Sequence, residues 1–189
     1  MLQHDNTLQL AAAQASCVIL KAGGYDALYT QPSGSAFYGN PNPNDFDVLV
    51  LLRCPNNGPE PWSVDEDDGL PGYAPGDLDD FVQRMKGLGY KDCGEDGNTS
   101  GGNSDEEDYR VNWCALRGTP AADHDEQFCT PREVNLIVTT DIIWYYRQVA
   151  ASCYCRHIRL NTGRAPHKDQ VVAIFRAVRE AVNPYKKED

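Results

Sequence analysis

Two aspartates, Asp45 and Asp47, are separated by one residue and lead into an apolar run that ends at Leu52. Side chains two positions apart on a β-strand point to the same face, so both carboxylates are expected to lie together at the start of a buried strand. Paired carboxylates are the hard oxygen ligands that Mg²⁺ uses when it also binds substrate phosphates. The pair therefore predicts a site for phosphoryl or nucleotidyl transfer, with Asp45 and Asp47 as metal ligands and catalytic residues.

A double glycine, Gly23-Gly24, precedes the aspartates, and the segment from Tyr25 to Tyr29 is compatible with a helix. Glycines at the start of a helix let backbone N–H groups approach phosphates without obstruction by side chains. We therefore expect Gly23, Gly24 and Tyr25 to face the phosphates of a bound nucleotide. Farther along the chain, Arg147 follows an aromatic cluster. Two interpretations stay open: a tyrosine of this cluster stacks on a base while arginines hold phosphates, or the aromatic run belongs to the core and the arginines to a solvated helix face.

The elements that must position these residues are predicted from hydrophobic periodicity and from capping and turn residues. Helices are expected over residues 7–15, 78–86, 142–156 and 166–182, and strands over residues 45–52, 109–116 and 133–139. Residues 31–44 are rich in proline and glycine and are expected to form a loop. Together these elements predict an α+β fold, with a mixed sheet and flanking helices in one domain that spans residues 1–189.

The order of these elements resembles the DNA polymerase beta-like nucleotidyltransferase superfamily. The family pattern is a helix, then a Gly-Gly or Gly-Ser step that opens a second helix, then a strand that bears two alternating acids. Here the matching segments read Leu20-Lys21-Ala22-Gly23-Gly24-Tyr25-Asp26 and Asn44-Asp45-Phe46-Asp47-Val48-Leu49-Val50. The arrangement is most similar to small divergent members from phage genomes, which also carry a later strand and an aromatic helix. Those would be Val134-Asn135-Leu136-Ile137-Val138 and Trp144-Tyr145-Tyr146.

The resemblance implies a nucleotidyltransferase that binds a nucleoside triphosphate (NTP) and Mg²⁺ at a two-metal site. It would transfer a nucleoside monophosphate to a hydroxyl of an acceptor, whether RNA, protein or small molecule. Catalytically complete members carry a third acid on a neighbouring strand, where this chain has Asn135. An amide is neither a base nor a strong metal ligand, but Glu133 shares the same face about 7 Å along the strand and can replace the acid. If it does not, the site binds nucleotide without turnover or relies on base catalysis relayed by water.

The formal net charge of −11 is concentrated in one segment. Residues 65–108 contain 14 acidic and 3 basic side chains, a difference of −11, within an acidic insert at about residues 54–108 that is expected to be mobile. The charge disfavours nonspecific binding of nucleic acid by the whole molecule. It supports a second hypothesis, in which the chain is a catalytically inactive, phage-encoded interaction protein. Its partner would be a host protein, a nucleic-acid enzyme that it inhibits.

Several general features indicate a compartment. The chain has 7 cysteines but no C-x-x-C pair, which favours a reducing environment over a disulfide framework. Its N-terminus lacks the basic and apolar regions of a signal peptide, and the sequence has no run of about 18–20 apolar residues that could span a membrane. We therefore expect a cytoplasmic protein, in the host cytoplasm if it is phage-encoded, with no membrane partner.

Overall fold

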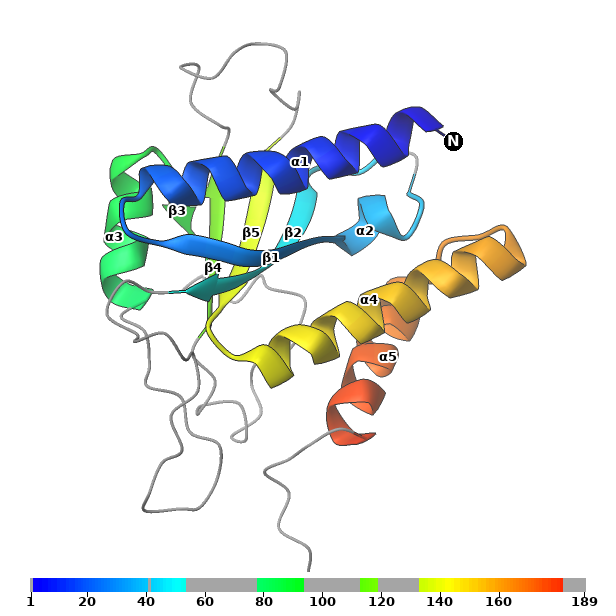
Figure 1. Cartoon of the computed structure of the whole chain (residues 1–189). Coiled ribbons are helices and arrows are strands. Elements are labelled where there is room, and N and C mark those ends of the chain that lie inside the picture. Colours follow the sequence, from blue (N-terminus) through cyan, green and yellow to red (C-terminus); the bar gives the residue numbers. More distant parts are fainter. Residues whose placement is uncertain (1, 41, 54–77, 94–112, 119–132, 182–189) are drawn as a thin grey trace, which may run out of the picture.

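A computed structural model describes residues 2–40, 42–53, 78–93, 113–118 and 133–181. Within these ranges the chain forms five helices and five strands, drawn in Figure 1. In chain order they are α1 (Leu2–Lys21), β1 (Asp26–Ser33), α2 (Gly34–Phe37), β2 (Phe46–Arg53), α3 (Leu78–Gly87), β3 (Lys91–Asp92), β4 (Trp113–Gly118), β5 (Val134–Thr139), α4 (Ile142–Thr162) and α5 (Lys168–Ala181).

The strands form one mixed sheet in the order β1-β2-β5-β4-β3. β2 and β5 are parallel, whereas the β1–β2, β5–β4 and β4–β3 pairs are antiparallel. Helices α1 and α3 cover one face of the sheet, α4 covers part of the other, and α5 packs against α4 (Figure 1). The α+β class and the mixed sheet with flanking helices are therefore confirmed.

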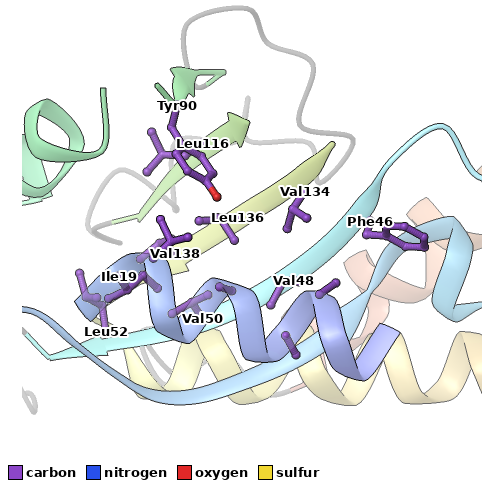
Figure 2. Packing of buried hydrophobic residues seen from close by; sticks show 14 of the residues in the cluster. Ile19, Phe46, Val48, Val50, Leu52, Tyr90, Leu116, Val134, Leu136 and Val138 are labelled. Carbon is purple, nitrogen blue, oxygen red and sulfur yellow. The ribbon is translucent and has the colours of Figure 1, made fainter. Parts of the chain in front are cut away.

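Strand β2 lies inside the sheet because its side chains are apolar on both faces. Val48, Val50 and Leu52 point toward α1 and pack with residues of β5, as Figure 2 shows. Leu49 and Leu51 point the other way, toward Tyr145 of α4. Period-two alternation explains this division, since neighbouring strand residues face opposite sides. The buried strand predicted for residues 45–52 is confirmed, one residue farther along the chain.

The structure corrects the prediction for the segment before β2. Residues 25–29 are not helical, and residues 31–33 are not in a loop, because the chain from Asp26 to Ser33 forms β1. Pro32, which favoured the loop prediction, is tolerated because β1 is the outer strand next to β2 in the described sheet. A segment of five residues carries little periodic signal, so pairing with β2 decides its conformation.

The other predicted elements are present with shifted ends. The strand over residues 133–139 and the helices that start near residues 78, 142 and 166 correspond to β5, α3, α4 and α5. The first helix is longer than expected, at residues 2–21 rather than 7–15, and the strand predicted for residues 109–116 is described only from Trp113. None of the helices in the described ranges is long and apolar enough to cross a membrane.

Most of the predicted acidic insert lies outside the described residues, namely residues 54–77 and 94–108. The described middle of that segment belongs to the fold. Phe81 and Met85 of α3 are fully buried in the main core, and Tyr90 packs near Leu116 of β4 (Figure 2).

Candidate functional site

One row of polar side chains crosses the end of the sheet where β2 begins. The strand register pairs Ser33 with Asp47, Asp47 with Asn135, and Asn135 with Arg117, on strands β1, β2, β5 and β4. Residues paired in register share a face of the sheet. In this row that face is the α4 side, because Leu49, two residues after Asp47, packs there.

The Asp47 carboxylate lies between groups from two other segments, β5 and the start of α2. Asn135 donates from Nδ2 to Asp47 Oδ1 at 2.8 Å. On the other side, the Oδ2 atom lies against the backbone of Gly34, where a Cβ atom would stand only 1.6 Å away. Gly34 has a φ of +68°, so its left-handed backbone conformation also favours glycine. A glycine turn and the carboxylate are thus in direct contact.

This enclosure shifts the protonation of Asp47. Burial raises the pKa of Asp47 from 3.8 to about 6, and the negative charge of Asp45 raises it as well. The hydrogen bond from Asn135 and the positive charge of Arg117 lower the same pKa and partly offset the rise. The influence of Asp45 indicates that the two carboxylates lie close together, as their spacing predicts.

Asp45 precedes β2 and forms an ion pair that joins β4 to the site. Arg117 Nη2 lies 3.1 Å from Asp45 Oδ2, and the two side chains are 40% and 22% exposed. The guanidinium also has a buried Nε atom that finds no hydrogen-bond partner in the described ranges of the chain. The paired aspartates therefore have a positive charge of the protein beside them.

The candidate third acid is absent from the strand itself. Asn135 stands beside Asp47, and its buried Oδ1 atom has no hydrogen-bond partner within the part of the chain that the structure describes. Glu133 lies just before β5, with an exposed side chain and a carbonyl oxygen that accepts from Phe46 N at 3.0 Å. This hydrogen bond extends the β2–β5 pairing to Glu133. Glu133, two residues before Asn135, therefore lies at the same end of the sheet as the aspartates.

A buried hydroxyl cluster joins α4 to the glycine turn. Ser33 Oγ, the residue before Gly34, lies 2.7 Å from Ser152 Oγ of α4. Tyr38 Oη is 3.4 Å from both serine oxygens. Burial raises the pKa of Tyr38 to about 12, so this hydroxyl remains neutral at physiological pH. The cluster fixes the start of α2 against α4.

Gly23 and Gly24 are not near the aspartates, which corrects the expectation that they face the same ligand. Both follow the C-terminus of α1 with positive φ, and Arg84 of α3 donates to the carbonyl of Gly23 at 3.3 Å. They precede Asp26, which pairs with Arg53 at the far end of β2. Arg53 lies six positions after Asp47, which corresponds to about 20 Å along a strand.

Tyr25 and Arg147 are also directed away from the aspartates. Tyr25 is buried, its ring packs on Phe81, and its hydroxyl donates to Asp80 Oδ2 at 2.8 Å. Arg147 is buried between α4 and α5, where Nη2 donates to the carbonyl of Arg179 at 2.7 Å. Both side chains join helices to the rest of the fold.

Two site residues were missed in the sequence. Gly34 begins a Gly-Ser step eleven positions before Asp45, but it stands in a segment whose prolines and glycines predicted a loop. A search for Gly-Ser as well as Gly-Gly steps before the aspartates would have found it. Arg117 has no local signal, because only the pairing of β4 with β5 brings it to the site.

The residues present fit one divalent cation better than two. Asp45 and Asp47 are suitable ligands, and Mg²⁺ commonly uses one or two carboxylates together with substrate phosphates. With both carboxylates ionised and Arg117 charged, the three side chains have a net charge of −1. Within the part of the chain that the structure describes, no cluster of three histidine, cysteine or acidic side chains could hold a metal ion.

Comparisons of the chain with protein-family models, curated proteins and solved structures give no match. The protein is therefore classified by its fold. The protein is a mixed α+β domain with two carboxylates and a glycine turn at one end of its sheet.

Proposed function

We propose that this protein binds a nucleoside triphosphate as its magnesium complex and transfers the nucleoside monophosphate to a hydroxyl acceptor. The observation that carries the proposal is the contact between the Asp47 carboxylate and the Gly34 turn, with Asp45 beside it. This arrangement supports the resemblance to nucleotidyltransferases, but with a different glycine step from the one predicted. The glycine step that opens a short helix before the acidic strand is Gly34-Ser35, not Gly23-Gly24.

In this proposal Asp45 and Asp47 hold the cation, which neutralises charge on the phosphates when bound. The acceptor oxygen forms a bond to the α-phosphorus, and the bond between the α-phosphorus and the bridging oxygen breaks to release pyrophosphate. Asn135 keeps Asp47 oriented through its 2.8 Å hydrogen bond. We assign the proton of the acceptor hydroxyl to Glu133, an exposed carboxylate at this end of the sheet.

Binding is tested by isothermal titration calorimetry with each of the four common NTPs and Mg²⁺. The double substitution Asp45→Ala/Asp47→Ala is expected to weaken binding by about 100-fold or more, because the cation loses both of its carboxylate ligands. Asp26→Ala is the matched control, since it removes a carboxylate that is paired with Arg53 at the opposite end of β2. Equal affinity in the wild type and the double variant would reject the site.

Transfer is tested separately, by release of pyrophosphate in the presence of candidate hydroxyl acceptors. Glu133→Gln is expected to lower the rate by about 100-fold, the usual contribution of a general base, without changing NTP affinity. An unchanged rate would remove Glu133 from the mechanism. Binding without release in the wild type would leave a nucleotide-binding protein and reject the transferase.

The alternative hypothesis, an acidic protein that inhibits a host enzyme, depends on the charge of residues 65–108. Most of that segment lies outside the described residues, and its described part contributes α3 to the core. The hypothesis stays a prediction from the sequence.

A further inference from the structure

Arg117 and a metal ion would compete for the same carboxylate. The guanidinium of Arg117 is 3.1 Å from Asp45 Oδ2, and Asp45 is one of the two ligands assigned to the cation. An arginine side chain stays charged at any pH that the fold tolerates. A cation can therefore bind Asp45 fully only if the guanidinium moves or shares the carboxylate.

The surroundings of Arg117 show what it can bind instead. Its Nε atom is buried and has no hydrogen-bond partner among the described residues, so within that part of the chain the contact with Asp45 leaves one N–H donor of the guanidinium unused. The fork of a guanidinium matches two oxygens of a phosphate, in a geometry that a point charge cannot reproduce. Because Arg117 pairs in register with Asn135, beside Asp47, phosphates bound at the aspartates would lie within reach of this side chain.

We propose that Arg117 is a phosphate-binding residue that Asp45 holds in the free protein and releases to the phosphates when a cation–nucleotide complex binds. This inference rests on the proposed function and adds a role for a residue outside the acidic strand. In this exchange the ion pair between Arg117 and Asp45 is lost and two are formed, one between the cation and Asp45 and one between Arg117 and a phosphate. Cation and nucleotide are consequently expected to bind cooperatively, each strengthening the other.

The experiment measures binding of two probes, Mn²⁺ alone and each magnesium–NTP complex, by titration calorimetry. Arg117→Gln is expected to bind Mn²⁺ about tenfold more tightly, because Asp45 loses its competing positive charge. The same variant is expected to bind the magnesium–NTP complex about tenfold more weakly, because a charged donor to phosphate is lost. A purely structural role would not shift the two affinities in opposite directions.

Two further variants serve as controls. Arg117→Lys keeps the positive charge, so its Mn²⁺ affinity is expected to stay within about threefold of the wild type. Arg53→Gln removes an arginine of similar exposure, 48% against 40%, from an ion pair at the other end of β2. It changes the net charge equally and is expected to leave both affinities unchanged, which separates a local effect from a general one.

The inference is overturned if Arg117→Gln leaves both affinities unchanged or weakens both. Failure of the proposed function gives a different pattern, in which the wild type binds none of the magnesium–NTP complexes. If the wild type binds NTP and Arg117→Gln does not alter that affinity, only the role of Arg117 is rejected.

Discussion

Asp47, which we propose as a metal ligand, lies in an unfavourable environment for its own charge. It is a carboxylate in a partly apolar sheet, next to a second carboxylate, with one amide donor and one guanidinium to compensate. Such groups recur at sites where binding of a ligand or cation relieves the cost of ionisation. Two predictions follow from the contacts of this residue.

The first concerns pH. Because the folded-state pKa of Asp47 is raised from 3.8 to about 6, its ionisation costs stability as pH rises through that window, and the cost is complete above it. The experiment is done in the presence of a chelator, so that no divalent cation binds. The free energy of unfolding of Asp47→Asn minus that of the wild type should be about 2 kcal/mol larger at pH 7 than at pH 4. Urea denaturation at both pH values measures the difference. A difference that does not change with pH would show that Asp47 ionises normally.

The second concerns Gly34. Gly34→Ala places a Cβ atom at 1.6 Å from Asp47 Oδ2 in a backbone with φ of +68°. The control is Gly89→Ala, where φ is +91° but nothing lies within 4 Å of the added atom. The control should lose about 1–2 kcal/mol from the backbone conformation alone. Gly34→Ala should lose at least about 2 kcal/mol more, because the Asp47 side chain must move. If urea denaturation gave both variants the same loss of unfolding free energy, the Asp47 side chain would be able to move away from the added methyl group at no cost.

At the scale of elements, α4 determines the geometry of the site although it supplies none of the proposed ligands. Its first turn is capped by Asp141, whose Oδ1 accepts from Trp144 N at 2.8 Å. Trp144 then stacks on Trp113 of β4, with ring centroids 5.8 Å apart. Farther along the helix, Ser152 reaches the residue before Gly34. The helix is thus attached to strands on both sides of the aspartates.

The prediction at this scale tests the hydroxyl cluster. Ser152→Ala leaves the buried hydroxyls of Ser33 and Tyr38 with a single 3.4 Å contact between them, so we expect a loss of about 1–2 kcal/mol. Ser16→Ala is the matched control. The Ser16 hydroxyl donates to the Ala12 carbonyl oxygen within α1, at 3.3 Å, so its removal should cost about 0.5 kcal/mol or less. Chemical denaturation compares the two. Similar losses would show that the cluster adds nothing beyond a local contact.

At the scale of the whole molecule, strand β2 separates two clusters. One end carries Asp47 and its partners. The other end carries the Arg53–Asp26 pair and a hydrogen bond from Tyr25, in the link between α1 and β1, to Asp80 of α3. The second cluster joins α3 to the body of the protein and is therefore expected to stabilise the fold.

This separation makes a prediction for Tyr25. Tyr25→Phe removes the hydrogen bond to Asp80 and should lower the free energy of unfolding by about 1 kcal/mol. NTP affinity should remain within about twofold, because distant sites act independently. Denaturation and titration calorimetry measure the two effects. A tenfold change in NTP affinity would mean that the Gly23-Gly24 end takes part in binding.

Features that depend on local pattern could be predicted from the sequence. The apolar run after Asp47 predicted the buried strand β2, and the helical spacing in residues 78–86 and 166–182 predicted α3 and α5. Alternation also predicted that Asp45 and Asp47 lie together, since strand geometry alone places them on one face.

Which other residues meet the aspartates depends on how the strands pair in the folded protein. Pairing with β2 made residues 26–33 a strand, and this pairing moved Gly23-Gly24 to one end of the sheet and brought Gly34 to the other. Arg117 reaches Asp45 from a strand that joins the sheet through β5. Contacts between residues far apart in sequence depend on strand register, which is set by burial of whole faces and not by the residues near a motif.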